Sequence, residues 1–149
     1  MAASVSETLI RLGRGIPGLA VATLIGGVPV ADNHVALEGG CNVVVGTPGR
    51  VRFLMKDGLL RFGRAQTLVL DSADWLMAPV FKEDVGWIAG RFPNDKQVLA
   101  FSGADPAAIV AGLRELVESP KMVSIGGNYA SASSTAVVLE QGEAVAAAV

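Results

Sequence analysis

The chain has 149 residues, a length that suits one domain with a substantial buried core. Hydrophobic residues make up 51% and charged residues 17%, which excludes an intrinsically disordered chain. The net charge of −2 excludes a general attraction to nucleic acid or to acidic membranes. The single cysteine, Cys41, excludes an intrachain disulfide and a zinc cluster, and we expect it to be a small buried side chain.

Helical and strand-like segments alternate from residue 5 to residue 125. Helical patterns are predicted over Val5–Arg14, Val30–Leu37, Pro48–Lys56, Val80–Phe92 and Pro106–Glu118. Continuous apolar runs predict strands over Leu19–Ile25, Asn42–Gly46, Thr67–Asp71, Gln97–Ser102 and Lys121–Ile125. Continuous rather than alternating runs indicate a parallel sheet covered on both faces. The fold class predicted is therefore α/β, with helices flanking a parallel sheet.

Proline positions, helix caps and local composition refine the predicted elements. The uncharged stretch from residue 15 to residue 31 is interrupted by Pro17 and Pro29, so we expect no membrane span there. Thr47 and Asp105 are predicted to cap the helices that follow them, each with a proline at the first helical position. From residue 126 to residue 149 alanine, serine and valine dominate, and we expect a low-complexity tail or linker with at most a short strand at Val137–Glu140.

Four polar turns directly follow predicted strands. They are Gly26-Gly27, Thr47-Pro48-Gly49-Arg50, Asp71-Ser72-Ala73-Asp74 and Ser102-Gly103-Ala104. Because the carboxyl ends of parallel strands meet at one edge of a sheet, and ligands bind at that edge, we expect the four turns to line a common cleft.

Each turn allows two interpretations. Carboxylates such as Asp71 and Asp74 can hold magnesium on a nucleotide through water, or they can simply end a strand and cap the next turn. At a helix start, Gly49 would let a phosphate approach and Arg50 would fork onto its oxygens, or Arg50 is an ordinary surface arginine. His34, the sole histidine, is expected at the surface without a catalytic partner.

Basic residues concentrate after the second turn. Five of the twelve lie between positions 50 and 64, with Asp57 as the single acid among them: Arg50, Arg52, Lys56, Arg61 and Arg64. The cluster is either a solvated helix face or a patch that faces phosphates.

In their order and spacing, the four turns resemble the G-G, T-P-G-R, D-E-A-D and S-A-T motifs of DEAD-box RNA helicases. Trp75-Leu76-Met77 and the segment from Phe92-Pro93 to Gln97 are similar to the family's sequence around motifs II and III. The resemblance implies that residues 5–125 form part of a first RecA-like domain and that residues 126–149 follow it. Cys41-Asn42-Val43 and Lys96-Gln97-Val98 lean toward the member found in the survival-of-motor-neuron complex, and we expect a cytoplasmic or nuclear location.

The resemblance also implies roles for individual residues. RNA would be gripped by its backbone at Gly26, Gly27, Thr47, Pro48, Gly49 and Arg50. Asp71 would support magnesium on ATP through water, and Asp74 would couple the nucleotide to Ser102, Gly103 and Ala104. The implied partners are RNA and a second RecA-like domain, and the implied cofactors are ATP and magnesium.

Three departures argue against full activity. Ser72 stands where the family has the motif II glutamate, Ala104 replaces a threonine, and no phosphate-binding G-K-[ST] occurs in the chain. ATP binding by this chain alone is therefore in question, and turnover and unwinding would be impaired or lost. The alternative is a non-catalytic pseudo-helicase module that binds proteins in ribonucleoprotein assembly. A phosphorelay receiver domain would explain Asp71 and Asp74 but not the other turns.

The missing phosphate-loop strand has a structural consequence. In this fold it lies beside the motif III strand, so we expect Gln97–Ser102 to present an unpaired apolar edge. Such an edge predicts marginal stability or dependence on a partner, as in a gene fragment.

Overall fold

The computed structural model describes residues 1–103, 106–115, 121–126, 135–140 and 146–148, and side chains within 1–103 and 109–115. The helices are α1 (Ala2–Leu12), the 3-10 turn η1 (Gly13–Gly15), α2 (Val30–Glu38), α3 (Pro48–Lys56), α4 (Ala73–Leu76), α5 (Pro79–Ala89) and α6 (Pro106–Arg114). The strands are β1 (Val21–Leu24), β2 (Val43–Gly46), β3 (Thr67–Asp71), β4 (Gln97–Ser102), β5 (Lys121–Gly126), β6 (Thr135–Glu140) and β7 (Ala146–Ala148).

The predicted elements are confirmed, with small shifts at their ends. The bounds of α3, β3 and β4 agree with the prediction residue for residue. The first helix begins earlier than predicted, at Ala2, and ends before Gly13. The short helix α4 was not predicted, because four residues are too few to show a helical period.

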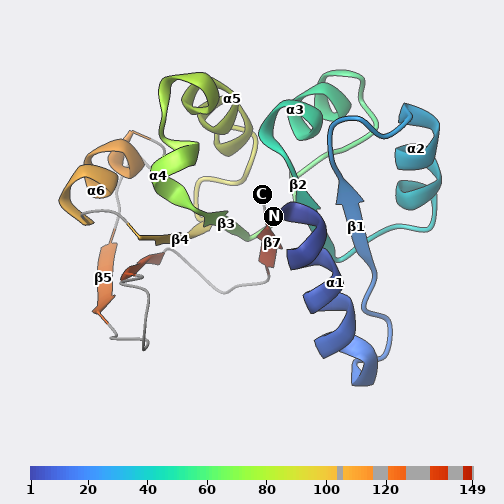
Figure 1. Cartoon of the computed structure of the whole chain (residues 1–149), viewed down its shortest axis with the longest axis horizontal. Helices are drawn as coiled ribbons and strands as arrows, with labels where there is room; N and C mark the ends of the chain where they lie inside the picture. Colours follow the sequence, from blue (N-terminus) through green and yellow to red (C-terminus); the bar gives the residue numbers. More distant parts are fainter. Residues whose placement is uncertain (104–105, 116–120, 127–134, 141–145, 149) are drawn as a thin grey trace.

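Within the described residues, the strands form one sheet in the order β1-β2-β7-β3-β4-β6-β5. Every neighbouring pair in the series β1-β2-β7-β3-β4 is parallel, whereas β6 runs antiparallel to both β4 and β5. Helices α2 to α6 lie on one face of this sheet and α1 lies on the other (Figure 1). The predicted α/β class with a largely parallel sheet is confirmed.

The expectation of an unpaired edge at Gln97–Ser102 is wrong. On one side β4 pairs with β3, and on the other side β6 covers it from Val98 opposite Leu139 to Ser102 opposite Thr135. Both β6 and β7 come from residues 126–149, whose composition predicted a tail with at most one short strand. The division of the chain into a domain and a tail stays a prediction.

The core lies between the sheet and the helices above it. Leu54 of α3, Leu68 and Leu70 of β3 and Ile88 of α5 are almost completely buried there. At Gly46, a Cβ atom would come within 2.5 Å of Val51 Cγ2 and 2.7 Å of the Leu24 carbonyl oxygen. Only glycine therefore lets α3 pack this closely against the end of β2.

One predicted helix cap is confirmed in its position but not in its hydrogen bond. Thr47 occupies the position before α3, but its side chain makes no capping hydrogen bond. The helix start depends instead on Pro48, which occupies the first turn with its φ already suited to a helix. The other predicted cap, Asp105, lies outside the described residues.

Candidate nucleic-acid interface

The polar turns lie at one edge of the sheet, as predicted. Since β1, β2, β3 and β4 are parallel, the turns that follow them share the carboxyl edge and succeed one another along it. We call this edge the carboxyl rim and define it by Gly26-Gly27, Thr47–Arg50, Asp71–Asp74 and Ser102-Gly103. Ala104, the last predicted member, lies outside the described residues.

Arg50 is turned into the protein. Its Nη1 donates to Asn33 Oδ1 over 2.7 Å and its Nη2 donates to the Val28 carbonyl oxygen over 2.8 Å. Val28 directly follows Gly26-Gly27, so Arg50 connects the glycine turn to the start of α3. Two N–H groups of Arg50 are therefore engaged within the protein, and the RNA contact implied by the resemblance stays a prediction.

Asn33 of α2 is a partner of the rim that sequence reasoning missed. Only 2% of it is exposed, although it is polar. The spacing of Val30, Asn33 and Leu37 places all three on one face of α2, so a polar residue within an apolar stripe was the available signal. Its buried amide is satisfied by Arg50, as buried polar groups require.

The glycine turn is open. A Cβ atom would meet nothing within 4 Å at Gly26 or Gly27, and Gly27 has a φ of +81°. Such a φ favours glycine, and the bare backbone leaves room for a ligand to approach. This turn therefore fits close contact with a nucleic-acid backbone.

The start of α3 is partly occupied by the chain itself. A Cβ atom at Gly49 would lie 3.6 Å from Asp84 Oδ2, so a carboxylate lies beside the helix N-terminus. Asp84 also pairs with Arg52, which forms a second ion pair with Glu83 at 2.9 Å. These hydrogen bonds raise the pKa of Arg52 above its ordinary value, so it stays charged. A phosphate at Gly49 would compete with Asp84.

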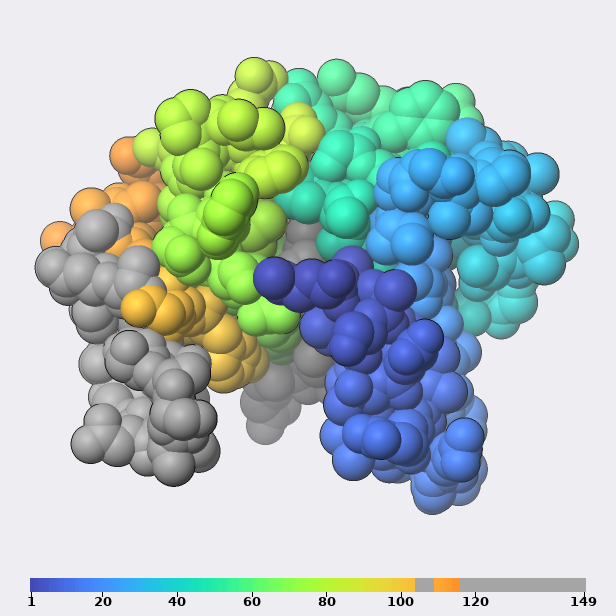
Figure 2. All heavy atoms as spheres, viewed as in Figure 1, coloured from blue at the N-terminus to red at the C-terminus, as the bar shows by residue number. Residues whose placement is uncertain are grey.

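The motif II and motif III turns are in direct contact. Ser102 Oγ donates to Asp74 Oδ1 over 2.8 Å, which links the end of β4 to α4. Ser72 adopts a left-handed conformation, with a φ of +55° and a ψ of +53°. Its Oγ lies 3.3 Å from Met1 Sδ. In Figure 2 the first residues of the chain, in dark blue, lie against the green atoms of the α4 region.

A small pocket lies between β2 and β3 at the rim. It has a volume of about 190 Å³ and is almost entirely apolar. Thr47, Pro48 and Asp71 line it, together with Met1 and Phe81. Two of the predicted turns therefore do face a common cavity. Among the described residues, no group of three or more His, Cys, Asp or Glu side chains is arranged to hold a metal ion.

Two side chains outside the rim were also predicted. Cys41 is half-buried, and burial raises the pKa of its thiol, which favours the unreactive protonated form. His34 lies on α2 and is half-buried rather than fully at the surface. In the described part of the chain, no helix is long and apolar enough to cross a membrane.

The fold and the rim define a helicase-type RecA-like domain, and comparison with known proteins gives its family. The model of the DEAD/DEAH box helicase family matches residues 1–111. The chain therefore belongs to the DEAD/DEAH box helicase family.

Curated relatives agree with this family. The chain is 36% identical over 125 residues to the DEAD-box ATP-dependent RNA helicase CshA of Streptococcus pneumoniae serotype 4, a match that covers 84% of this chain and 24% of the relative. It is 38% identical over 112 residues to the chloroplastic DEAD-box ATP-dependent RNA helicase 3A of Zea mays, covering 75% of this chain and 15% of the relative. The chain thus spans about a quarter or less of the length of these relatives.

Solved structures show the same fold. A DEAD box protein from the hyperthermophile Methanococcus jannaschii superposes with a TM-score of 0.68 at 31% identity, covering 76% of this chain and 31% of that one. Mss116p, solved bound to single-stranded RNA and AMP-PNP, superposes with a TM-score of 0.71 at 20% identity, covering 78% of this chain and 25% of that one. The RecA-like fold is confirmed.

Proposed function

We propose that this chain binds the RNA backbone without sequence preference, as part of a DEAD-box helicase domain whose ATP-dependent unwinding is impaired or lost. The observation that carries the proposal is the tethered rim, in which Arg50 connects the glycine turn to α3. Relatives of the chain are named ATP-dependent RNA helicases, and one structural neighbour was solved with single-stranded RNA.

Binding would rely on backbone groups. Gly26, Gly27 and the first turn of α3 at Thr47, Pro48 and Gly49 would offer N–H groups and close approach to phosphate oxygens. Such contacts carry no base information, so affinity would be similar for unrelated sequences and would fall with salt. Arg50 then acts as a positioning residue that keeps the two segments in register.

The nucleotide side of the rim departs from the family pattern in this sequence. Asp71 fits a water-mediated contact to magnesium, and Asp74 is already oriented by Ser102. When bound, ATP with magnesium would supply the free energy that drives RNA release and domain closure. Ser72 cannot act as a base at neutral pH, and a general base contributes about 10²–10⁴-fold in rate. The chain also has no G-K-[ST] to cradle phosphates.

The wider context is proposed from the same resemblance. A second RecA-like domain would complete the RNA and nucleotide clefts. Cytoplasmic or nuclear placement, and kinship with the survival-of-motor-neuron-complex member, stay parts of the proposal.

RNA binding at the rim is testable with single variants. In fluorescence anisotropy with short single-stranded RNAs of unrelated sequence, Arg50→Ala should weaken binding about tenfold for every RNA. Asn33→Ala should weaken it less, because that variant keeps the Arg50 bond to the Val28 carbonyl oxygen. Arg14→Ala, which removes an exposed arginine of η1, is the matched control for charge.

The outcomes separate the alternatives. If Arg50→Ala weakens binding and Asn33→Ala does not, the bond to Asn33 contributes nothing and Arg50 acts through Val28 or through RNA itself. If neither variant differs from Arg14→Ala, the rim does not bind RNA. Circular dichroism of each variant establishes that it is folded.

A second function, a pseudo-helicase module for protein binding, is favoured by the exposed apolar side chains near the rim. Trp75 is 68% exposed, Val80 78% and Phe101 41%. Where exposed apolar side chains form a contiguous patch, the patch marks a protein contact site. Co-purification of partners that survives nuclease and is lost in Trp75→Ala would support this function over RNA binding.

A further inference from the structure

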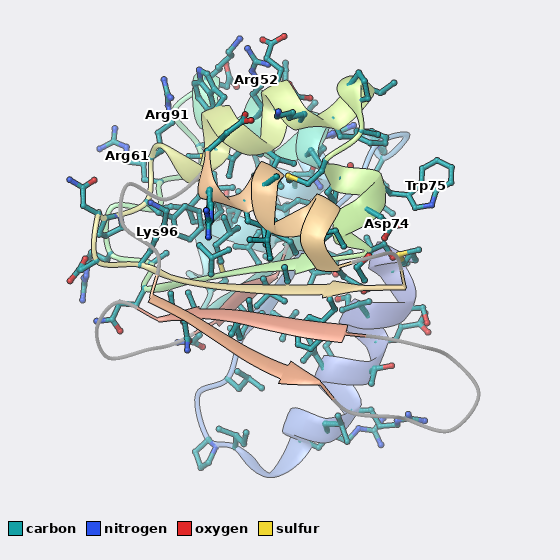
Figure 3. The ribbon with its side chains drawn as sticks, turned by 90° about the vertical axis from the view of Figure 1, so that its left-hand side faces the viewer. Arg52, Arg61, Asp74, Trp75, Arg91 and Lys96 are labelled. Atoms are coloured by element: carbon teal, nitrogen blue, oxygen red, sulfur yellow. The ribbon has the colours of Figure 1, made fainter. Side chains whose placement is uncertain are left out.

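A second pocket lies at the opposite edge of the sheet from the carboxyl rim. It has a volume of about 550 Å³ and is formed by the end of α3, the segment that leads into β3, and the end of α5. Its lining residues are Met55, Lys56, Leu60, Arg61, Phe62, Gly63, Trp87 and Arg91. We call it the basic pocket. Figure 3 shows Arg61 and Arg91 at one end of the molecule and Asp74 and Trp75 at the other.

The floor of the basic pocket is apolar and rigid. Leu60 is 6% exposed and Phe62 is 4% exposed, so both belong to the core. Phe62 stacks on Phe92, with ring centroids 4.6 Å apart. Met55 adds a flexible thioether at the side, which adapts to different ligand shapes.

The walls carry positive charge, and no acidic side chain lines them. The lining cations are Lys56, Arg61 and Arg91. The nearby carboxylates of Glu83 and Asp84 pair with Arg52. Within residues 1–103 and 109–115, no ion pair involves any of the three lining cations.

Trp87 contacts two of these cations, Arg91 and Lys56. The Arg91 guanidinium carbon lies 3.5 Å from the ring centroid, and Lys56 Nζ lies 5.6 Å from it. Arg91 also donates to the Trp87 carbonyl oxygen over 3.0 Å, through Nη1. A guanidinium stacked in this way keeps its other N–H groups directed outward, in a fork that matches a carboxylate. Because Arg91 is already ordered in the free protein, binding a ligand would cost less conformational entropy.

We propose that the basic pocket binds an acidic peptide segment of a protein partner. One large apolar side chain of that segment fills the floor over Leu60 and Phe62, and flanking carboxylates pair with Arg61 and Arg91. The volume lies within the roughly 300–1,000 Å³ of ordinary ligand pockets.

The pocket suits a peptide better than RNA. A nucleic-acid strand binds by stacking bases on aromatic faces, but Arg91 already covers a face of Trp87. A phosphate backbone would gain nothing from an apolar floor. The position at the other edge of the sheet also leaves the carboxyl rim free, so the site does not depend on RNA binding at the rim.

The test uses Trp87 as its own reporter. The chain has two tryptophans, so Trp75→Phe leaves Trp87 as the single emitter. The full 149-residue chain is titrated with a synthetic peptide of one phenylalanine flanked by aspartates and glutamates. The matched probe carries asparagine and glutamine instead, and oligouridylate is a third probe.

We expect saturable quenching or a spectral shift with the acidic peptide, and at least tenfold weaker binding of the neutral peptide. Arg61→Gln should weaken binding of the acidic peptide about tenfold, while Arg14→Gln leaves it unchanged. Isothermal titration calorimetry of Arg91→Gln gives the same comparison without relying on Trp87 emission.

Three results would overturn the proposal. The first is that the acidic peptide does not bind. The second is that it binds the Arg61→Gln and Arg91→Gln variants as tightly as the parent chain. The third is that oligouridylate shifts Trp87 emission and displaces the peptide, which would assign the pocket to nucleic acid.

Discussion

The two ends of the sheet use their charged side chains in opposite ways. At the carboxyl rim the polar groups bind one another: Arg50 is bonded to Asn33 and Val28, and Ser102 to Asp74. At the basic pocket the cations of Lys56, Arg61 and Arg91 face a cavity that no acid lines. Internal hydrogen bonds fix a shape, whereas unneutralised charge attracts a partner. The rim is therefore built for precise geometry and the basic pocket for recruitment.

The largest expected effect tests the tight packing behind the rim. Gly46→Ala would place a Cβ atom against Val51 and the Leu24 carbonyl oxygen, so the free energy of unfolding should fall by about 2–3 kcal/mol. Urea denaturation measures it. Gly63→Ala, in the basic pocket, meets nothing within 4 Å and should change stability by less than about 0.5 kcal/mol. Equal losses of stability in the two variants would show that the rim is not more tightly packed than the basic pocket.

A smaller effect tests whether rim hydrogen bonds stabilise the fold. Ser102→Ala removes the donor to Asp74, and the free energy of unfolding should fall by about 1 kcal/mol. Arg61→Ala removes an exposed side chain of the basic pocket and should leave stability within about 0.5 kcal/mol of the parent. If Arg61→Ala lowered the free energy of unfolding more than Ser102→Ala did, the basic pocket rather than the rim would stabilise the fold.

The smallest effect concerns Cys41, which lies just before β2 and away from both sites. Burial raises the pKa of its thiol, so the thiolate fraction near neutral pH is lower than in the unfolded chain. Alkylation by iodoacetamide should therefore be slower in the folded protein and should rise over a higher pH range than in the unfolded chain. The urea-unfolded chain is the reference, and equal rates in both states would contradict the assignment.

Much of the fold could be predicted from local patterns. Continuous apolar runs located β3 and β4 to the residue, since a buried parallel strand needs apolar residues on both faces. Pro48 located the start of α3 for a similarly local reason. The order of the turns along the rim followed once the strands were taken as parallel.

Other features depend on contacts between distant residues and could not be predicted. The partner of β4 is β6, and β7 inserts between β2 and β3, although the composition of residues 126–149 gave little sign of a sheet. The five basic residues between 50 and 64 also divide. Arg50 bonds to Asn33 and Val28, Arg52 pairs with acids of α5, Lys56 and Arg61 line the basic pocket, and Arg64 is exposed. Neither a solvated face nor a single phosphate patch describes them.

By itself, the sequence determined the α/β class, the family and the identity of the rim turns, because strand burial, helix starts and motif spacing are properties of neighbouring residues. Only the tertiary structure decided which cations are neutralised. Arg50 and Asn33 are 17 residues apart and Arg52 and Asp84 are 32 apart. Which charged residues pair across such sequence separations depends on how the helices and strands pack. The periodicity of a local segment carries no information about that packing.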